Sequence, residues 1–125
     1  MLNDEIHVLK NRFVEQLSPL KVYLFGSYAY GIPDKDSDYD FYIVVDDSRA
    51  DSYEQTVLAY RAIRHARTRP VDIVVGTNSA FETQIKENQH SIENEVFRKG
   101  ILLYGAKKAI EAAEAIYNWV NTLIP

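Results

Sequence analysis

The stretch FGSYAYGIPDKDSDYDFYIVV, residues 25–45, places a series of acids directly before an apolar run that is typical of a buried strand. The acids occupy every second position: Asp34, Asp36, Asp38 and Asp40. Residues two apart in a strand share a face, so Asp38 and Asp40 would lie about 6.5–7 Å apart and repel each other. We interpret the first two acids as solvated loop residues and the last two as ligands of a divalent cation. The alternative is that the strand begins at Phe41, which leaves both later acids in a solvated loop.

A second feature, Gly26-Ser27, stands at a strand-to-helix turn and is separated from Asp38 by ten residues. Glycine lets a ligand approach the backbone closely. A helix start also offers unpaired N–H groups and a partial positive charge to an anion. We predict that Ser27 is the N-cap of a short helix ending at Gly31, and that the turn binds phosphate. By itself, the pair is more often a tight turn with a serine cap.

A third acid, Asp72, stands alone in the apolar segment VDIVV. Aspartate is disfavoured inside a strand and is rarely buried unless it is paired, so its presence here must be explained. It could lie at a sheet edge or pair with a nearby arginine such as Arg69. If its strand lies beside that of Asp38 and Asp40, the three carboxylates form one cluster. Such a cluster beside a phosphate-binding turn suits a two-metal site for phosphoryl or nucleotidyl transfer.

Hydrophobic periodicity and turn residues predict an α/β (α+β) domain in which helices pack against a small mixed sheet of about four strands. The expected strands are 20–25, 38–45, 70–75 and 101–104, the third ended by Gly76. The expected helices with defined ranges are 2–17, 51–66 and 106–123, in addition to the short helix from Ser27. A further helix is expected to be capped by Asn78 or Ser79 and to contain Phe81 and Ile85. Another is expected to be capped by Ser91, with Ile92, Val96 and Phe97 facing inward.

Composition bounds the function classes. The 125 residues suit a single domain, 1–125, and no apolar run approaches the roughly 20 residues of a membrane span. The absence of cysteine excludes disulfides and thiolate chemistry and is compatible with a cytoplasmic protein. A net charge of −4 argues against strong nucleic-acid binding, although a local basic patch could still bind phosphate.

The joint pattern resembles a known family. Gly-Ser-x-x-x-Gly at Gly26 to Gly31, Ser-Asp-x-Asp at Ser37 to Asp40, and a single aspartate on a later strand resemble the nucleotidyltransferase superfamily related to DNA polymerase beta. Within that superfamily the chain is most similar to the minimal nucleotidyltransferases (MNT). The resemblance covers residues 20–46 specifically and 70–76 with support, so it implies a nucleotidyltransferase fold with a catalytic core at about 20–76.

The resemblance also implies the roles of the residues that match. Gly26 and Ser27 would hold the β- and γ-phosphates of a nucleoside triphosphate, with ATP as the expected substrate. Asp38 and Asp40 would ligate Mg²⁺, with two ions expected. Asp72 would ligate the metal nearest the attacking hydroxyl and help to remove its proton. The implied reaction is nucleotidyl transfer with release of pyrophosphate.

The acceptor follows only from the resemblance. Minimal nucleotidyltransferases are typically encoded beside a HEPN-domain RNase toxin, which implies an antitoxin that binds the toxin and transfers AMP to one of its tyrosines. Two alternatives stay open. One is an antitoxin that neutralises its partner by binding alone, and the other is a small-molecule nucleotidyltransferase of the aminoglycoside-modifying type. The chain has no evident second domain for a small molecule, which argues against the latter.

Two segments bear on partners. The expected last helix, 106–123, carries two adjacent apolar stripes, so it either packs between the sheet and the N-terminal helix or presents a docking surface for a helical, hetero-oligomeric partner. The segment RAIRHARTR, residues 61–69, is either a solvated helix end or a contact for RNA, an acidic partner or the triphosphate.

Overall fold

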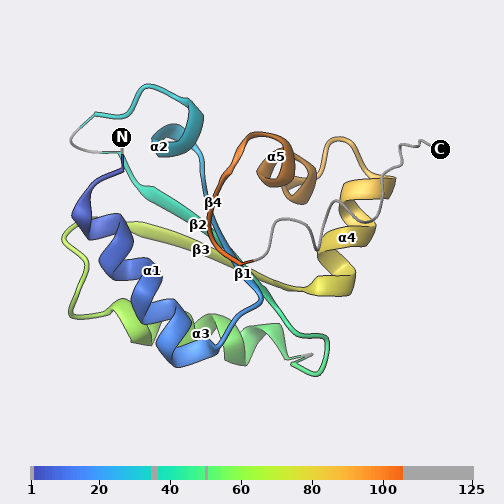
Figure 1. The fold of residues 1–125 in the computed structure, drawn as a ribbon, viewed down its shortest axis with the longest axis horizontal. Coiled ribbons are helices and arrows are strands. Elements are labelled where there is room, and N and C mark those ends of the chain that lie inside the picture. The colour runs from blue at the N-terminus through green and yellow to red at the C-terminus, as the bar shows by residue number, and fades with distance from the viewer. Residues whose placement is uncertain (1, 35–36, 50, 106–125) are drawn as a thin grey trace.

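The computed structural model describes residues 2–34, 37–49 and 51–105. Its helices and strands are α1 (Asp4–Leu17), β1 (Lys21–Phe25), α2 (Ser27–Tyr30), β2 (Tyr39–Val45), α3 (Ser52–Ile63), β3 (Val71–Thr77), α4 (Asn78–Glu87), α5 (Ile92–Lys99) and β4 (Ile101–Tyr104). Figure 1 shows helices on both sides of one twisted sheet. This arrangement confirms the α/β fold class.

The described sheet has four strands in the order β3-β2-β1-β4. β1 pairs antiparallel with both β2 and β4, whereas β2 and β3 run parallel. Parallel neighbours need a crossover connection, and α3 supplies it. The sheet is therefore mixed, as predicted, and β3 is an edge strand.

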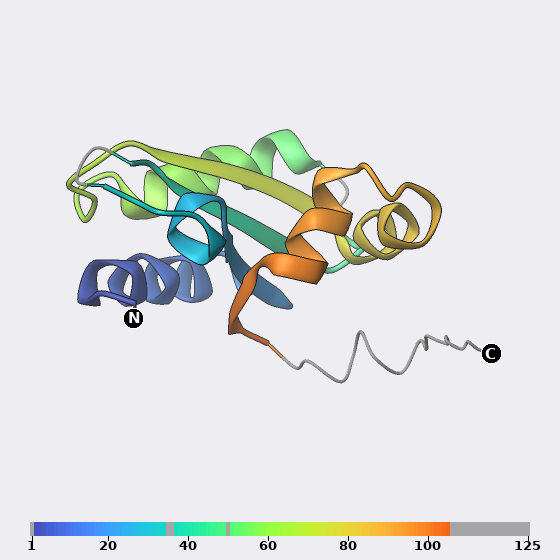
Figure 2. The same cartoon turned by 90° about the horizontal axis from the view of Figure 1, so that it is seen from above.

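Each face of the sheet is covered by helices over a cluster of buried apolar side chains. On one face, α1 and α3 lie against each other and cover a core that includes Phe13, Phe41 and Ile63. On the other face, α4 and α5 contribute Phe81 and Val96 to a second cluster with Tyr42. Figure 2 shows α4 and α5 packed together, away from α1. Alternate residues of β2 therefore face opposite layers, which the chain fills with apolar side chains on both sides.

Local sequence explains why α1 begins and ends where it does. The side chain of Asn3 accepts a hydrogen bond from the N–H of Ile6 at 2.9 Å, which caps the helix. Four apolar residues at helical spacing are fully buried: Ile6, Leu9, Phe13 and Leu17. Ser18 ends the helix in the left-handed conformation, directly before Pro19.

Three expectations about helix caps and strand ends were wrong. Ser27 is the first residue of α2 rather than its N-cap, because Gly26 takes the cap position with no side-chain hydrogen bond. β3 continues through Gly76 to Thr77, because both residues keep their parallel partners on β2. Thr77, rather than Asn78 or Ser79, then caps α4.

The ends of two other elements also differ from the expectation. β2 begins at Tyr39, so Asp38 lies just before the strand and not in it. α3 ends at Ile63 rather than near 66, because the N–H groups of Arg64 and Ala66 each donate to a carbonyl three residues earlier, which is the spacing of a tighter turn.

The inward face of α5 was predicted only in part. Ser91 caps the helix and Val96 is buried, as expected, but Ile92 and Phe97 are 39% and 37% exposed. Asn94 takes an inward position instead, and its side chain donates to the carbonyl of Ile85 at 2.8 Å. A hydrogen-bonded amide therefore occupies a place where the pattern predicted an apolar side chain.

Within the described part of the chain, no helix combines the length and apolarity needed to cross a membrane. The predicted last helix, 106–123, and Asp36 lie outside the described residues. Asp34 is exposed in the loop before β2, as expected.

Candidate active site

The three predicted carboxylates lie at the end of the sheet where β2 and β3 begin. Asp40 and Asp72 are direct partners in the parallel ladder, so their side chains stand next to each other on the same face. Asp38 comes one residue before β2 and is half-buried, like Asp40, whereas Asp72 is exposed on the edge strand. Of the two explanations for Asp72, the edge position is the one that the structure supports.

Asp40 is the most electrostatically perturbed of these acids. Burial, together with the charges of Asp72 and Asp38 and a hydrogen bond to Asp72, raises the pKa of Asp40 to about 6. A carboxylate held among like charges destabilises the folded protein at any pH where it is ionised, unless a cation offsets the repulsion. The arrangement therefore favours binding of a positive ion over a bare acidic cluster.

Gly26 brings the predicted phosphate-binding turn against this cluster. Its φ of +76° lies in the left-handed region, which favours glycine. A Cβ on Gly26 would come within 2.1 Å of Oδ2 of Asp40. The antiparallel register gives the reason, because Phe25 and Asp40 are ladder partners at the end of β1. The turn and the Asp40 carboxylate are thus in contact, and any side chain at position 26 would be strained and would have to displace Asp40.

The donor set suits a hard divalent cation such as Mg²⁺, which prefers carboxylate oxygens. Asp40 and Asp72 adjoin directly, and Asp38 is near enough for its charge to act on Asp40. Among the described residues, however, no group of three His, Cys, Asp or Glu side chains is gathered into a ready-made metal cage. The three-carboxylate metal site accordingly stays a prediction, with Asp40 and Asp72 as its best-placed pair.

Arg69 links the two halves of this site. Its guanidinium lies 5.4 Å from the ring centre of Tyr28 and 4.8 Å from that of Tyr39, within the range of cation–π attraction. It donates hydrogen bonds to the Tyr28 hydroxyl and, at 3.3 Å, to the carbonyl of Ser37. Tyr28 follows Ser27 in the turn, and Ser37 precedes Asp38. Arg69 therefore fixes the turn relative to the first carboxylate, and does not pair with Asp72.

Glu5 of α1 interacts with the same arginine and with Tyr39 beside it. Its Oε1 lies 4.0 Å from Nε of Arg69 and accepts a 2.9 Å hydrogen bond from the Tyr39 hydroxyl. Burial by itself would raise the pKa of Glu5, but hydrogen bonds from the hydroxyl and N–H of Thr68 and from Tyr39 hold it below its usual value. The ionised carboxylate thus anchors the segment that carries Arg69 to α1.

α5 braces the site from the opposite face. The Tyr42 hydroxyl donates to Glu93 at 2.8 Å, and the Tyr30 hydroxyl donates to Glu95. Nζ of Lys99 lies 5.6 Å from the ring centre of Tyr30. Because Tyr30 is the last residue of α2, these contacts hold the short helix that follows Gly26.

Replacing Arg69 by lysine is expected to destabilise the fold by about 1–2 kcal/mol, since a point charge cannot reproduce the planar fork and the stacking. Urea denaturation measures the effect. Arg12→Lys, an exposed change on α1, is the matched control and should change the unfolding free energy by about 0.5 kcal/mol or less. Equal stability of the two variants would contradict the contacts that Arg69 makes with Tyr28 and Tyr39.

Sequence reasoning missed the roles of Arg69, Glu93 and Glu95. Each acts across a long sequence separation, so no local spacing marks it. The one weak signal for Arg69 was its position two residues before the apolar strand that carries Asp72, which suggested the wrong partner.

Comparisons with known proteins identify the family and the fold of the chain. The chain matches the family described as polymerase beta, nucleotidyltransferase over residues 7–109, which is most of its length. No curated protein matches it.

Solved structures show the same fold at low identity. One, a toxin–antitoxin with AMP-PNP, is 19% identical with a TM-score of 0.53 and covers 97% of this chain and 92% of that chain. A proposed nucleotidyltransferase from Sulfolobus solfataricus is 22% identical with a TM-score of 0.53, covering 83% and 86% respectively. A tri-AMPylated Shewanella oneidensis HEPN toxin in complex with an MNT antitoxin gives 18% identity and a TM-score of 0.50, covering 94% and 90%. By the family match and this shared fold, the chain belongs to the polymerase beta family of nucleotidyltransferases.

Proposed function

We propose that this protein is a Mg²⁺-dependent adenylyltransferase that transfers AMP from ATP to a tyrosine hydroxyl of a HEPN-type toxin and so acts as its antitoxin. The observation that carries the proposal is the contact between the Gly26 turn and Asp40, whose ladder partner is Asp72. A glycine turn and paired carboxylates in contact are what a triphosphate and its metal require.

Each residue has a role in this proposal. The backbone N–H groups at Gly26 and Ser27 bind the β- and γ-phosphates, and the absence of a side chain at position 26 lets the Asp40 carboxylate lie against the same turn. Asp38, Asp40 and Asp72 would hold the metal. When bound, Mg²⁺ would supply positive charge to the triphosphate and to the leaving pyrophosphate.

The transfer itself exchanges one phosphorus–oxygen bond for another. The acceptor oxygen attacks the α-phosphorus, the bond from that phosphorus to the bridging oxygen breaks, and pyrophosphate leaves with the electron pair. The proton of the acceptor hydroxyl passes to a carboxylate. Asp72 is the best placed for this step, because it is the exposed member of the cluster and lies on an edge strand that an acceptor can reach.

The choice of acceptor rests on the relatives. One similar structure is a toxin–antitoxin with AMP-PNP, and another is a tri-AMPylated HEPN toxin with its MNT antitoxin. Those descriptions concern other proteins, and they support a protein acceptor for this chain over a small molecule.

The test is to incubate the protein with Mg²⁺, ATP labelled on its α-phosphate, and the product of the neighbouring gene, which the proposal expects to be a HEPN-type protein. Label should enter a tyrosine of the partner, as located by mass spectrometry. ATP labelled on its γ-phosphate is the control and should leave the partner unlabelled. No transfer of α-label would overturn the proposal. Neutralisation of the partner without labelling would identify an antitoxin that acts by binding alone.

A further inference from the structure

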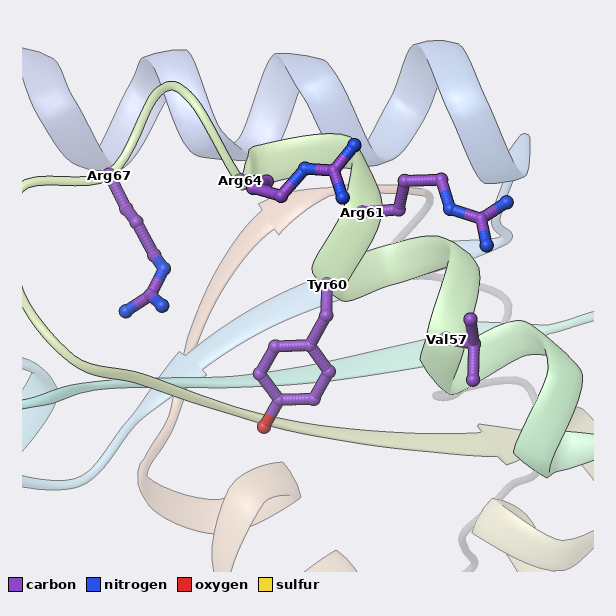
Figure 3. A pocket seen from close by; sticks show the side chains of 5 residues that line it. All are labelled: Val57, Tyr60, Arg61, Arg64 and Arg67. Atoms are coloured by element: carbon purple, nitrogen blue, oxygen red, sulfur yellow. The ribbon is translucent and has the colours of Figure 1, made fainter.

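A second site of a different character lies on α3 and the turn that follows it. Five residues line an open pocket of about 300 Å³: Val57, Tyr60, Arg61, Arg64 and Arg67. We call it the arginine pocket. Figure 3 shows the Tyr60 ring directed from α3 toward the strands, with Arg67 reaching from the turn beyond the helix.

The charges of this pocket are unmatched within the described residues. Arg61, Arg64 and Arg67 are all exposed. The one ion pair among the described residues joins Arg69 to Glu5 and involves none of these three arginines. Arg67 donates a hydrogen bond to the carbonyl of Arg69 at 3.2 Å, which leaves its charge uncompensated. Three guanidinium groups without an ion pair among the described residues thus surround one pocket, although the net charge of the chain is −4. A solvated helix end explains cations at the last turn, but not a pocket among them.

The floor of the pocket is apolar and held in place. The Tyr60 hydroxyl accepts a hydrogen bond from the N–H of Ile73 at 3.0 Å, which ties the ring to β3. The side chain of Val57, one helical turn earlier, completes the floor. A fixed aromatic ring and a branched aliphatic side chain, rimmed by arginines, suit a ligand that is apolar at its centre and acidic around it.

The pocket lies at the end of the sheet that carries the carboxylates. The segment joining α3 to β3 meets the start of β2, where the N–H of Tyr39 donates to the carbonyl of Pro70 at 3.2 Å. Ile73, which holds Tyr60, directly follows Asp72 in β3. A molecule seated on the arginines would therefore lie beside the edge strand that bears Asp72.

We propose that the arginine pocket docks an acidic, amphipathic helical segment of the acceptor protein, with an apolar side chain against Tyr60 and Val57 and carboxylates on the arginines. The inference rests on the proposed function only in taking this segment to belong to the acceptor. Carboxylates match the arginines of the rim by charge. Arg61 and Arg64 are one helical turn apart, which is also the spacing at which a partner helix presents two carboxylates on one face. A nucleic-acid strand fits less well, because the pocket offers a single aromatic ring and the aliphatic Val57 in place of the row of stacking surfaces that successive bases need.

The experiment measures binding by fluorescence polarisation, without ATP or Mg²⁺. The probe is a labelled helical peptide of about 14 residues with glutamates and leucines at helical spacing. The wild-type protein should bind it, and Arg61→Glu with Arg64→Glu should weaken binding by about tenfold or more. Arg12→Glu with Lys86→Glu makes the same change in net charge at exposed positions on α1 and α4 and should change binding by about twofold or less. Far-UV circular dichroism checks that both variants fold.

Three results would overturn the inference: no binding by the wild-type protein, equal loss of binding in the two double variants, or tighter binding of a single-stranded RNA of similar length than of the peptide. Because no nucleotide is present, these results do not depend on transfer activity. Failure of the labelling assay with peptide binding intact would remove the proposed reaction and keep the docking site.

Discussion

Replacing Asp38 and Asp40 together by asparagine is expected to abolish AMP transfer while making the metal-free protein more stable. Losing two of the three proposed metal ligands should lower the rate by about a thousandfold or more, since a metal contributes several kcal/mol of charge stabilisation. Stability should rise by about 1 kcal/mol at pH 8. That is less than the pKa of Asp40, about 6, would imply in a dry site, because water screens this half-buried carboxylate. The gain should shrink below pH 6, where Asp40 takes up a proton.

The measurements are the labelling assay and thermal unfolding with and without Mg²⁺. Mg²⁺ should raise the melting temperature of the wild-type protein and leave that of the double variant unchanged. Glu15→Gln with Glu87→Gln removes two exposed acids elsewhere and should keep both activity and the Mg²⁺ effect. A metal response that survives in the Asp38, Asp40 variant would show that the cation binds at another place.

Gly26→Ala should be the most damaging single substitution at the site. An alanine there adopts a left-handed φ of +76° and places its Cβ within 2.1 Å of Oδ2 of Asp40. Together, the backbone strain and the clash should cost about 3 kcal/mol of unfolding free energy. Transfer should also fall by about a hundredfold or more, because the turn must move away from the carboxylate it is proposed to serve. Chemical denaturation and the labelling assay test the two effects.

A double-mutant cycle separates clash from strain. The atoms nearest to the added Cβ all belong to the Asp40 side chain, so Asp40→Ala removes the clash and leaves the strain. In the Asp40→Ala background, Gly26→Ala should cost at least about 1 kcal/mol less than in the wild-type protein. Ser27→Ala, in the same turn, should change stability by about 0.5 kcal/mol or less, since Ser27 is the first residue of α2 and not its N-cap. Strict additivity would contradict the contact between position 26 and Asp40.

The parts of this fold that follow from local chemistry could be predicted from sequence. The amphipathic spacing of α1, the β-branched run of β2 and the Ser91 cap of α5 each depend on residues within a few positions of one another. The contact between Gly26 and Asp40 needs one longer-range step, because the antiparallel pairing of β1 with β2 brings the end of β1 beside the start of β2.

What escaped prediction depends on tertiary pairing. Gly76 looked like a strand terminator, yet the parallel ladder with β2 carries the strand past it, and a side chain there would meet the Tyr42 hydroxyl at 2.4 Å. Phe97 was expected to face the core, but Asn94 takes the inward position because its side chain donates a hydrogen bond to the carbonyl of Ile85. Arg69 looked like a partner for Asp72, but two tyrosine rings offered a better surface for its planar group. In each case a distant contact overrode the local pattern.

The hydrogen bond between Tyr60 and Ile73 has one more consequence. β3 lies at the edge of the sheet, and an edge strand offers its unpaired N–H groups as a template for strands of other chains. The Tyr60 hydroxyl occupies one of these groups in the strand that also carries Asp72. A strand from another molecule cannot pair at that position without displacing the tyrosine. The contact that shapes the arginine pocket thus also protects the protein from edge-to-edge aggregation at its candidate active site.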